Sequence, residues 1–225
     1  FPFENWGFVD GGMFYIGRTE GFKSGTWNPV ALTDAPEPVE PEQVVAYEGG
    51  FKTDLFQGYA RFNASVFHYD YKDLQITTIA LTSGGAVRLE NAGKAVVNGG
   101  EFELQFLPIE NLTVSMIGSA LRSEYKVCDC SGFEPTSGLG FQGNFAGNEL
   151  VAAPHFTGTL DVGYTFNVIG GSLEVAATGY HNSGYFFQAQ NSFAQDAYNT
   201  VGARISYLHD RSSLRISLYG QNLAD

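Results

Sequence analysis

Apolar and polar residues alternate along much of the chain, most plainly in the segment YARFNASVFHYDYKDLQI at residues 59–76. The apolar positions are Ala60, Phe62, Ala64 and Val66, and the polar positions between them are Arg61, Asn63 and Ser65. A period of two residues predicts a β-strand with one apolar and one polar face. The fold class then depends on whether the apolar faces meet a protein core or lipid.

Composition favours a protein made of strands. The chain has no apolar run near the roughly 18 residues that a transmembrane helix needs, so strands would have to make any membrane crossing. The 28 glycines and the aromatic content of 15% are typical of an all-β protein with many turns. A formal net charge of −12 would repel a nucleic-acid backbone, so we expect no nucleic-acid partner.

Period-two runs bounded by turn residues predict about nine strands. They cover residues 12–20, 44–54, 58–79, 87–107, 112–125, 154–166, 171–183, 198–208 and 213–222. The connections at LFQG, LPIEN, NVIGG and HDRSS are short, LTSGGA is intermediate, and those at about 21–43, 126–153 and 184–197 are long.

Short turns at one end and long loops at the other are expected of an outer-membrane barrel. A soluble sandwich has no reason to keep this asymmetry, because both of its ends face the same solvent. We therefore predict an all-β, up-and-down antiparallel transmembrane β-barrel, present here as a partial barrel. A soluble β-sandwich that acts as a binding module is the alternative, since a half-buried sheet also alternates.

In such a barrel the apolar face of each strand meets lipid and the polar face lines a wet lumen. The predicted lipid-facing residues are Phe62, Val66, Leu104, Phe106, Leu160, Val162, Ile205, Ile216 and Leu218. The predicted lumen-facing residues are Arg61, Glu101, Glu103, Asp161, Arg204 and Arg215. Tyr69 and Tyr71 are expected to mark the aromatic girdle where their strand leaves the bilayer.

An ordered series of segments resembles the C-terminal part of the barrel of TonB-dependent outer-membrane receptors. The segments are GRTEGFKSGTWN (17–28), PEQVVAYEGGFKTDLF (41–56), YARFNASVFHYDYKDLQI (59–76), ENAGKAVVNGGEFELQF (90–106), LVAAPHFTGTLDVGYTF (150–166) and LRISLYGQNLAD (214–225). Single motifs such as GFKSG or NAG are weak, but the ordered set spans nearly the whole chain. The resemblance implies a plugged barrel of about 22 strands in the outer membrane of a Gram-negative bacterium.

The implied activity is TonB-energised uptake of a scarce nutrient, most often a ferric siderophore. By the same resemblance, residues 1–225 are part of one barrel domain, without the plug domain, the TonB box or the last strands. We therefore expect TonB to be reached through a plug outside this segment, and no transport by the segment alone. A passive porin or an outer-membrane enzyme on a similar barrel is the alternative within the membrane class.

In a plugged barrel the long loops and adjoining strand ends meet the ligand first. The candidate ligand-binding residues there are Trp27, His155, His181, Tyr185, Phe186, Phe187 and Gln188. Their rings could stack on a flat siderophore or a sugar, or could belong to the upper girdle and anchor the barrel. Because the chain is acidic, an anionic ferric siderophore is a less natural ligand than a nutrient in general.

No catalytic residue, cofactor or metal site is predicted. The four histidines are scattered, and no G-x-S-x-G motif accompanies them. Cys128 and Cys130, in KVCDCSGFEP, could form a disulfide, bind a soft metal or remain two thiols in a loop. Zinc sites usually supply four ligands at wider spacing, so two loop thiols are the prediction.

Overall fold

The computed structural model describes residues 1–28, 37–80, 86–133, 140–212 and 214–224. Ten strands form one antiparallel sheet, in which each strand pairs with the next sheet strand along the chain. They are β1 (Pro2–Trp6), β2 (Val9–Lys23), β5 (Glu42–Leu55), β6 (Ala60–Lys72), β9 (Lys94–Ile109), β10 (Leu112–Val127), β13 (Phe156–Val168), β14 (Gly171–Asn182), β17 (Tyr198–His209) and β18 (Arg215–Gly220). This order confirms the up-and-down prediction and excludes a two-sheet sandwich.

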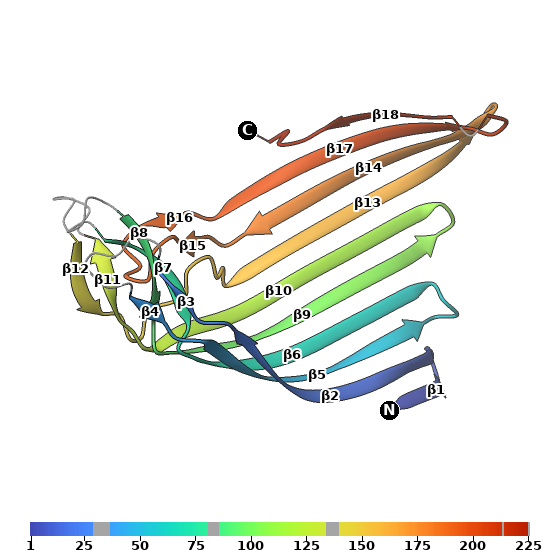
Figure 1. The fold of residues 1–225 in the computed structure, drawn as a ribbon. Coiled ribbons are helices and arrows are strands. Elements are labelled where there is room, and N and C mark those ends of the chain that lie inside the picture. Colours follow the sequence, from blue (N-terminus) through green and yellow to red (C-terminus); the bar gives the residue numbers. More distant parts are fainter. Residues whose placement is uncertain (29–36, 81–85, 134–139, 213, 225) are drawn as a thin grey trace.

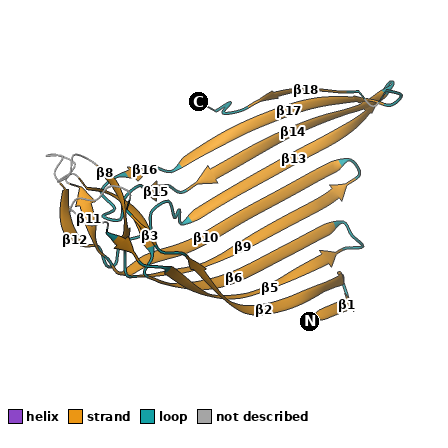
Figure 2. Ribbon diagram, viewed as in Figure 1, coloured by secondary structure: helices purple, strands orange, loops and turns teal. Residues whose placement is uncertain are grey.

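Figure 1 shows this sheet as one curved layer, with β1 and β18 at its two edges. Figure 2 shows that loops and turns alone connect the strands in the described part of the chain. None of the described residues belongs to a helix long and apolar enough to cross a membrane.

The two ends of the sheet differ as the connection lengths predict. At the turn end, on the right in Figure 1, tight turns join β1 to β2, β5 to β6, β9 to β10, β13 to β14 and β17 to β18. Asn111 and Gly170 close two of these turns with positive φ of 66° and 80°, a region that Asn and Gly enter at little cost.

The long connections gather at the loop end, and each contains a two-stranded hairpin. The hairpins are β3 (Thr26–Trp27) with β4 (Pro38–Val39), β7 (Gln75–Ala80) with β8 (Ala86–Asn91), β11 (Asp129–Phe133) with β12 (Gly140–Asn144), and β15 (Tyr185–Phe186) with β16 (Ala194–Gln195).

The strand register gives the sheet one polar and one apolar face, because directly opposed residues share a face. Arg61 lies opposite Gln105, Gln105 opposite Ser115, and Ser115 opposite Asp161. All six residues predicted to face the lumen lie on this polar face, and all nine predicted to face lipid lie on the other. Which face meets lipid in the assembled barrel remains a prediction.

Three details of the predicted strands were wrong. The predicted strand at 58–79 is broken at Asp73, where φ is 52°, and the one at 87–107 is broken at Gly93, where φ is 76°. The segments beyond these breaks leave the main sheet and pair as the β7–β8 hairpin. The sequence patterns also missed β1, which adds an edge strand to the predicted set.

The girdle role predicted for Tyr69 and Tyr71 conflicts with the lumen-facing role predicted for Arg61. Both lie at odd positions of β6 and therefore share the polar face with Arg61. The Tyr69 ring stacks on Phe67 at a centroid distance of 4.8 Å. Tyr71 packs against the buried cluster at the loop end.

Candidate ligand site at the loop end

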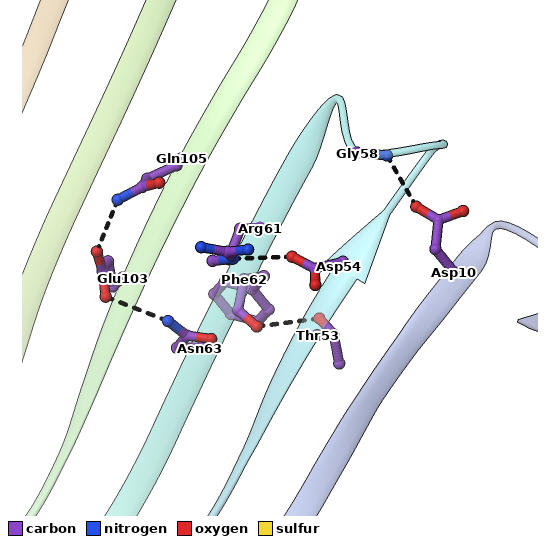
Figure 3. A network of polar contacts seen from close by, with 9 residues as sticks. All are labelled: Asp10, Thr53, Asp54, Gly58, Arg61, Phe62, Asn63, Glu103 and Gln105. Atoms are coloured by element: carbon purple, nitrogen blue, oxygen red, sulfur yellow. Dashed lines mark hydrogen bonds and ion pairs between the residues drawn. The ribbon is translucent and has the colours of Figure 1, made fainter. Parts of the chain in front are cut away.

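Near the turn end, polar side chains on the polar face bond to one another across the strands (Figure 3). Arg61 Nε donates to Asp54 Oδ1 at 2.8 Å, and Asn63 Nδ2 donates to Glu103 Oε2 at 3.2 Å. Gln105 Nε2 donates to the other oxygen of Glu103 at 3.0 Å. These groups satisfy one another, and Asp54, Arg61 and Gln105 also line a cavity of about 590 Å³ beside the turns.

The loop end contains the main cluster of buried side chains among the described residues. Tyr125, Cys128, Cys130, Phe145 and Ala189 pack there with Ala92 and Ala95. Tyr125 and Ala95 lie opposite each other at the ends of β10 and β9, and the other five come from the long connections. The long connections therefore fold over the polar face at the loop end and pack against it.

Cys128 and Cys130 form a disulfide, which corrects the prediction of two free thiols. Both residues are almost completely buried; Cys128 separates β10 from β11, and Cys130 is the second residue of β11. The hydrophobic surroundings exclude solvent from the bond. The disulfide directly precedes Ser131 and Gly132, which line the pocket described next.

A pocket of about 610 Å³ opens beside this cluster. Its lining comes from three connections and from the end of β10: Leu74, Gln75, Ile76, Thr77, Tyr125, Ser131, Gly132, Leu150, Val151, Phe187, Gln188, Ala189 and Gln190. None of these lining residues has a carboxylate, ammonium or guanidinium group. The described lining combines apolar walls with amide and hydroxyl groups, as is usual for small-molecule sites.

Asparagine side chains tie the connections to one another. The Asn28 side chain accepts from Leu89 N at 2.8 Å and donates to Leu89 O at 3.0 Å. Asn91 makes the same double contact with the backbone of Glu40, at 2.9 and 3.0 Å. Asn191 makes it with the backbone of Glu149, at 2.8 and 3.0 Å. Each amide replaces one step of a β-ladder and satisfies two backbone groups.

The connections that line the pocket are linked in this way. Asn191 follows the lining segment at residues 187–190, and its partner Glu149 precedes Leu150. Asn148 Nδ2 also donates to Ala189 O at 2.9 Å. On another side, Ser131 Oγ donates to Glu90 Oε1 at 2.5 Å. The pocket walls are therefore held in place before any ligand arrives.

Of the seven predicted ligand-binding residues, Phe187 and Gln188 line this pocket. The Phe187 ring contacts Tyr185 at a centroid distance of 5.2 Å and Phe193 at 5.1 Å. Phe186 lies opposite Ala194 in the β15–β16 hairpin, and its carbonyl accepts from Ala152 N. Tyr185 and Phe186 therefore support the segment that carries the pocket residues.

The other three candidates lie elsewhere. Trp27 lies opposite Pro38 in the β3–β4 hairpin and is 62% exposed. His155 Nε2 lies 2.9 Å from Glu149 Oε1. His181 lies on the apolar face, where Nδ1 is 2.8 Å from Asn199 Oδ1 and the ring is 5.9 Å from Phe156. The structure does not bring these three side chains together.

Sequence reasoning missed most of the pocket lining. Gln75 is buried, and its side-chain amide donates to the carbonyls of Ser24 and Glu40, both at 3.0 Å. Ser131 and Gly132 lie in the segment KVCDCSGFEP, which the sequence analysis considered only for the chemistry of its two cysteines. A usable signal was the aromatic Tyr125 near the end of a strand, three residues before a C-x-C pair.

The chain matches the family model described as TonB dependent receptor-like, beta-barrel, over residues 5–223. It therefore belongs to the TonB-dependent receptor family, whose members are outer-membrane transport receptors of Gram-negative bacteria. Among curated protein sequences, none matches this chain significantly.

Solved structures show the same fold. The ferric yersiniabactin uptake receptor FyuA from Yersinia pestis superposes with a TM-score of 0.76 at 21% identity, covering 100% of this chain and 31% of that one. The siderophore receptor PiuA from Acinetobacter baumannii gives 0.67 at 18% identity, covering 96% and 31%. The ferric-catecholate import receptor Fiu from E. coli K12 gives 0.60 at 16% identity, covering 96% and 30%. The chain thus spans about three-tenths of each of these receptors.

Proposed function

We propose that this chain forms part of the wall and outer loops of a receptor that takes up a scarce small-molecule nutrient with energy supplied through TonB. The observation that carries the proposal is the loop end itself. All the long connections gather there, cross-linked around one preformed pocket. A pocket at this end is placed to capture a ligand from outside the cell, before passage through the lumen.

The polar face supports the transport part of the proposal. Its paired carboxylate, guanidinium and amide groups suit a water-filled lumen or the surface of a plug. Outside this chain, the receptor would supply the plug and the contact with TonB. The apolar face would meet the lipid of the outer membrane.

The proposed ligand class is wider than ferric siderophores. The similar structures include a ferric yersiniabactin receptor and a ferric-catecholate receptor, which makes a ferric siderophore one candidate. However, the described pocket lining has no cationic side chain to bind an anionic chelate. Its phenol, phenyl and amide groups equally suit an uncharged ligand with a flat ring.

Membrane placement and uptake are tested in the full-length receptor that contains this chain. We expect the receptor in the outer-membrane fraction, and ligand uptake that stops in cells lacking TonB. A ferric catecholate, a ferric hydroxamate, cobalamin and an oligosaccharide are the ligands to compare. Uptake that continues without TonB would instead indicate a passive porin.

The binding residues are tested with two matched double variants. Phe187→Ala with Gln188→Ala removes pocket groups, whereas Trp27→Ala with His181→Ala removes candidates outside the pocket. We expect the first pair to weaken binding of the transported ligand by about tenfold or more, since an aromatic ring and an amide that line the pocket are lost. A larger effect of the second pair would show that the ligand binds near Trp27 and His181, outside this pocket.

A further inference from the structure

Basic residues gather at one place on the apolar face. Of the 12 lysines and arginines of the chain, five lie there beside the loop end, and we call them the basic margin: Arg18, Lys72, Lys94, Arg122 and Lys126. All five are exposed. The accumulation is notable because the whole chain has a net charge of −12.

The basic margin begins where the apolar surface ends. Ile16 and Val66 lie in one row across the strands and are 83% and 67% exposed. The next row towards the loop end contains Arg18, Tyr47, His68, Asn98 and Arg122. Successive rows on one face are about 7 Å apart, so the change from aliphatic to cationic surface takes a single step.

The next rows alternate in charge. Glu20, Asp70 and Glu124 follow, and each has a cationic partner or a histidine within 3.0 Å. One row further out, Lys72 lies directly opposite Lys94. Like charges at directly opposed positions destabilise a sheet unless a counter-charge lies between them. No acidic partner for either lysine is found among the described residues.

The two faces differ at this height. On the polar face, Tyr71 is covered by the cluster of folded connections. On the apolar face, Phe22 lies in the same row as Lys72 and is 78% exposed. An exposed aromatic ring beside cationic side chains is the usual composition of a membrane–water interface.

We propose that the basic margin binds the phosphate groups of membrane lipids in the leaflet nearest the loop end. Lipid supplies acyl chains for the aliphatic row and an anionic headgroup for the unpaired lysines in one molecule. A nucleic acid or an acidic protein would match the lysines but not the exposed Ile16 and Val66. The proposal rests on the membrane placement given under the proposed function.

The test uses the full-length receptor purified in a zwitterionic detergent. Binding of dimyristoyl phosphatidate and of dimyristoyl phosphatidylcholine is measured by native mass spectrometry. We expect preference for phosphatidate, and a loss of about 30-fold in phosphatidate affinity in the Lys72→Gln, Lys94→Gln double variant. The matched control is Lys52→Gln with Arg211→Gln, which removes the same charge from the polar face and the turn end.

Three results would overturn the proposal. The receptor could bind both lipids equally, both double variants could lose phosphatidate to the same extent, or excess inorganic phosphate could displace the lipid completely. The last result would assign the lysines to a free anion. Fractionation separates this inference from the proposed function, because a receptor absent from the outer membrane contradicts that function whatever lipid it binds.

Discussion

At the scale of single residues, an amide that pairs with a backbone unit is hard to replace. Removing the Asn191 side chain leaves Glu149 N–H and C=O without their partners. Unpaired, partly buried groups cost about 1–3 kcal/mol. We predict that Asn191→Ala makes amide hydrogen exchange at residues 184–197 about tenfold faster and weakens ligand binding in the full-length receptor.

The matched control is Asn167→Ala, near the turn end. Asn167 is exposed, and its side chain has no hydrogen-bond partner among the described residues. Exchange at 184–197 should stay at the wild-type rate in this variant. Equal acceleration in both variants, or none in Asn191→Ala, would show that the asparagine does not hold the pocket segment.

At the scale of elements, the disulfide should act locally. It links residues only two positions apart, so the loop-closure model gives a stabilisation on the order of 1.5 kcal/mol, against about 3 kcal/mol for a 15-residue loop. We predict that Cys128→Ala with Cys130→Ala speeds exchange in β11 and β12 but not in β13. Ligand affinity should fall as well, because Ser131 and Gly132 line the pocket. Faster exchange throughout β13 would instead show that the bond stabilises the whole sheet.

The elements of the main sheet could largely be predicted because their period of two is a local property of the sequence. Where the prediction failed, one backbone conformation decided the outcome. Alternation continues from β6 into β7, and the positive φ at Asp73 ends the strand without changing that pattern. Tyr69 and Tyr71 were assigned to the girdle by residue type, although their odd positions placed them with Arg61.

The candidate site was less predictable for a different reason. Phe187 and Gln188 could be named because aromatic and amide residues cluster in a long connection. Gln75, Tyr125 and Ser131 join them only through contacts between segments far apart in the chain. The contacts that arrange these segments, such as Ser131 with Glu90, span about 40 residues and have no local sequence pattern.

At the scale of the whole molecule, the sheet needs further strands to pair with its two edge strands. β1 and β18 each pair on one edge only in the described structure, so backbone N–H and C=O groups on their outer edges lack strand partners. Lipid cannot satisfy such groups, which is why spanning sheets close into barrels. We therefore expect the polar and apolar faces to become lumen and lipid surfaces once the receptor's barrel is complete.

This assignment of faces predicts opposite outcomes for the same substitution at two nearby positions of β13. Val162 is the middle residue of its apolar face, 37% exposed, and Thr159 points to the polar face beside Ile117 and Tyr180. Arginine facing the bilayer midplane costs about 2–4 kcal/mol, whereas a wet lumen accepts it. Val162→Arg should therefore reduce the amount of folded full-length receptor in the outer membrane, whereas Thr159→Arg should assemble as the wild type does. The folded amount is measured by heat-modifiable gel mobility.

The opposite result would contradict this assignment of the faces. If Thr159→Arg were the variant that failed to assemble, the polar face would be the one in contact with lipid. The lumen assignment of Arg61, Glu103 and Asp161 would then be reversed.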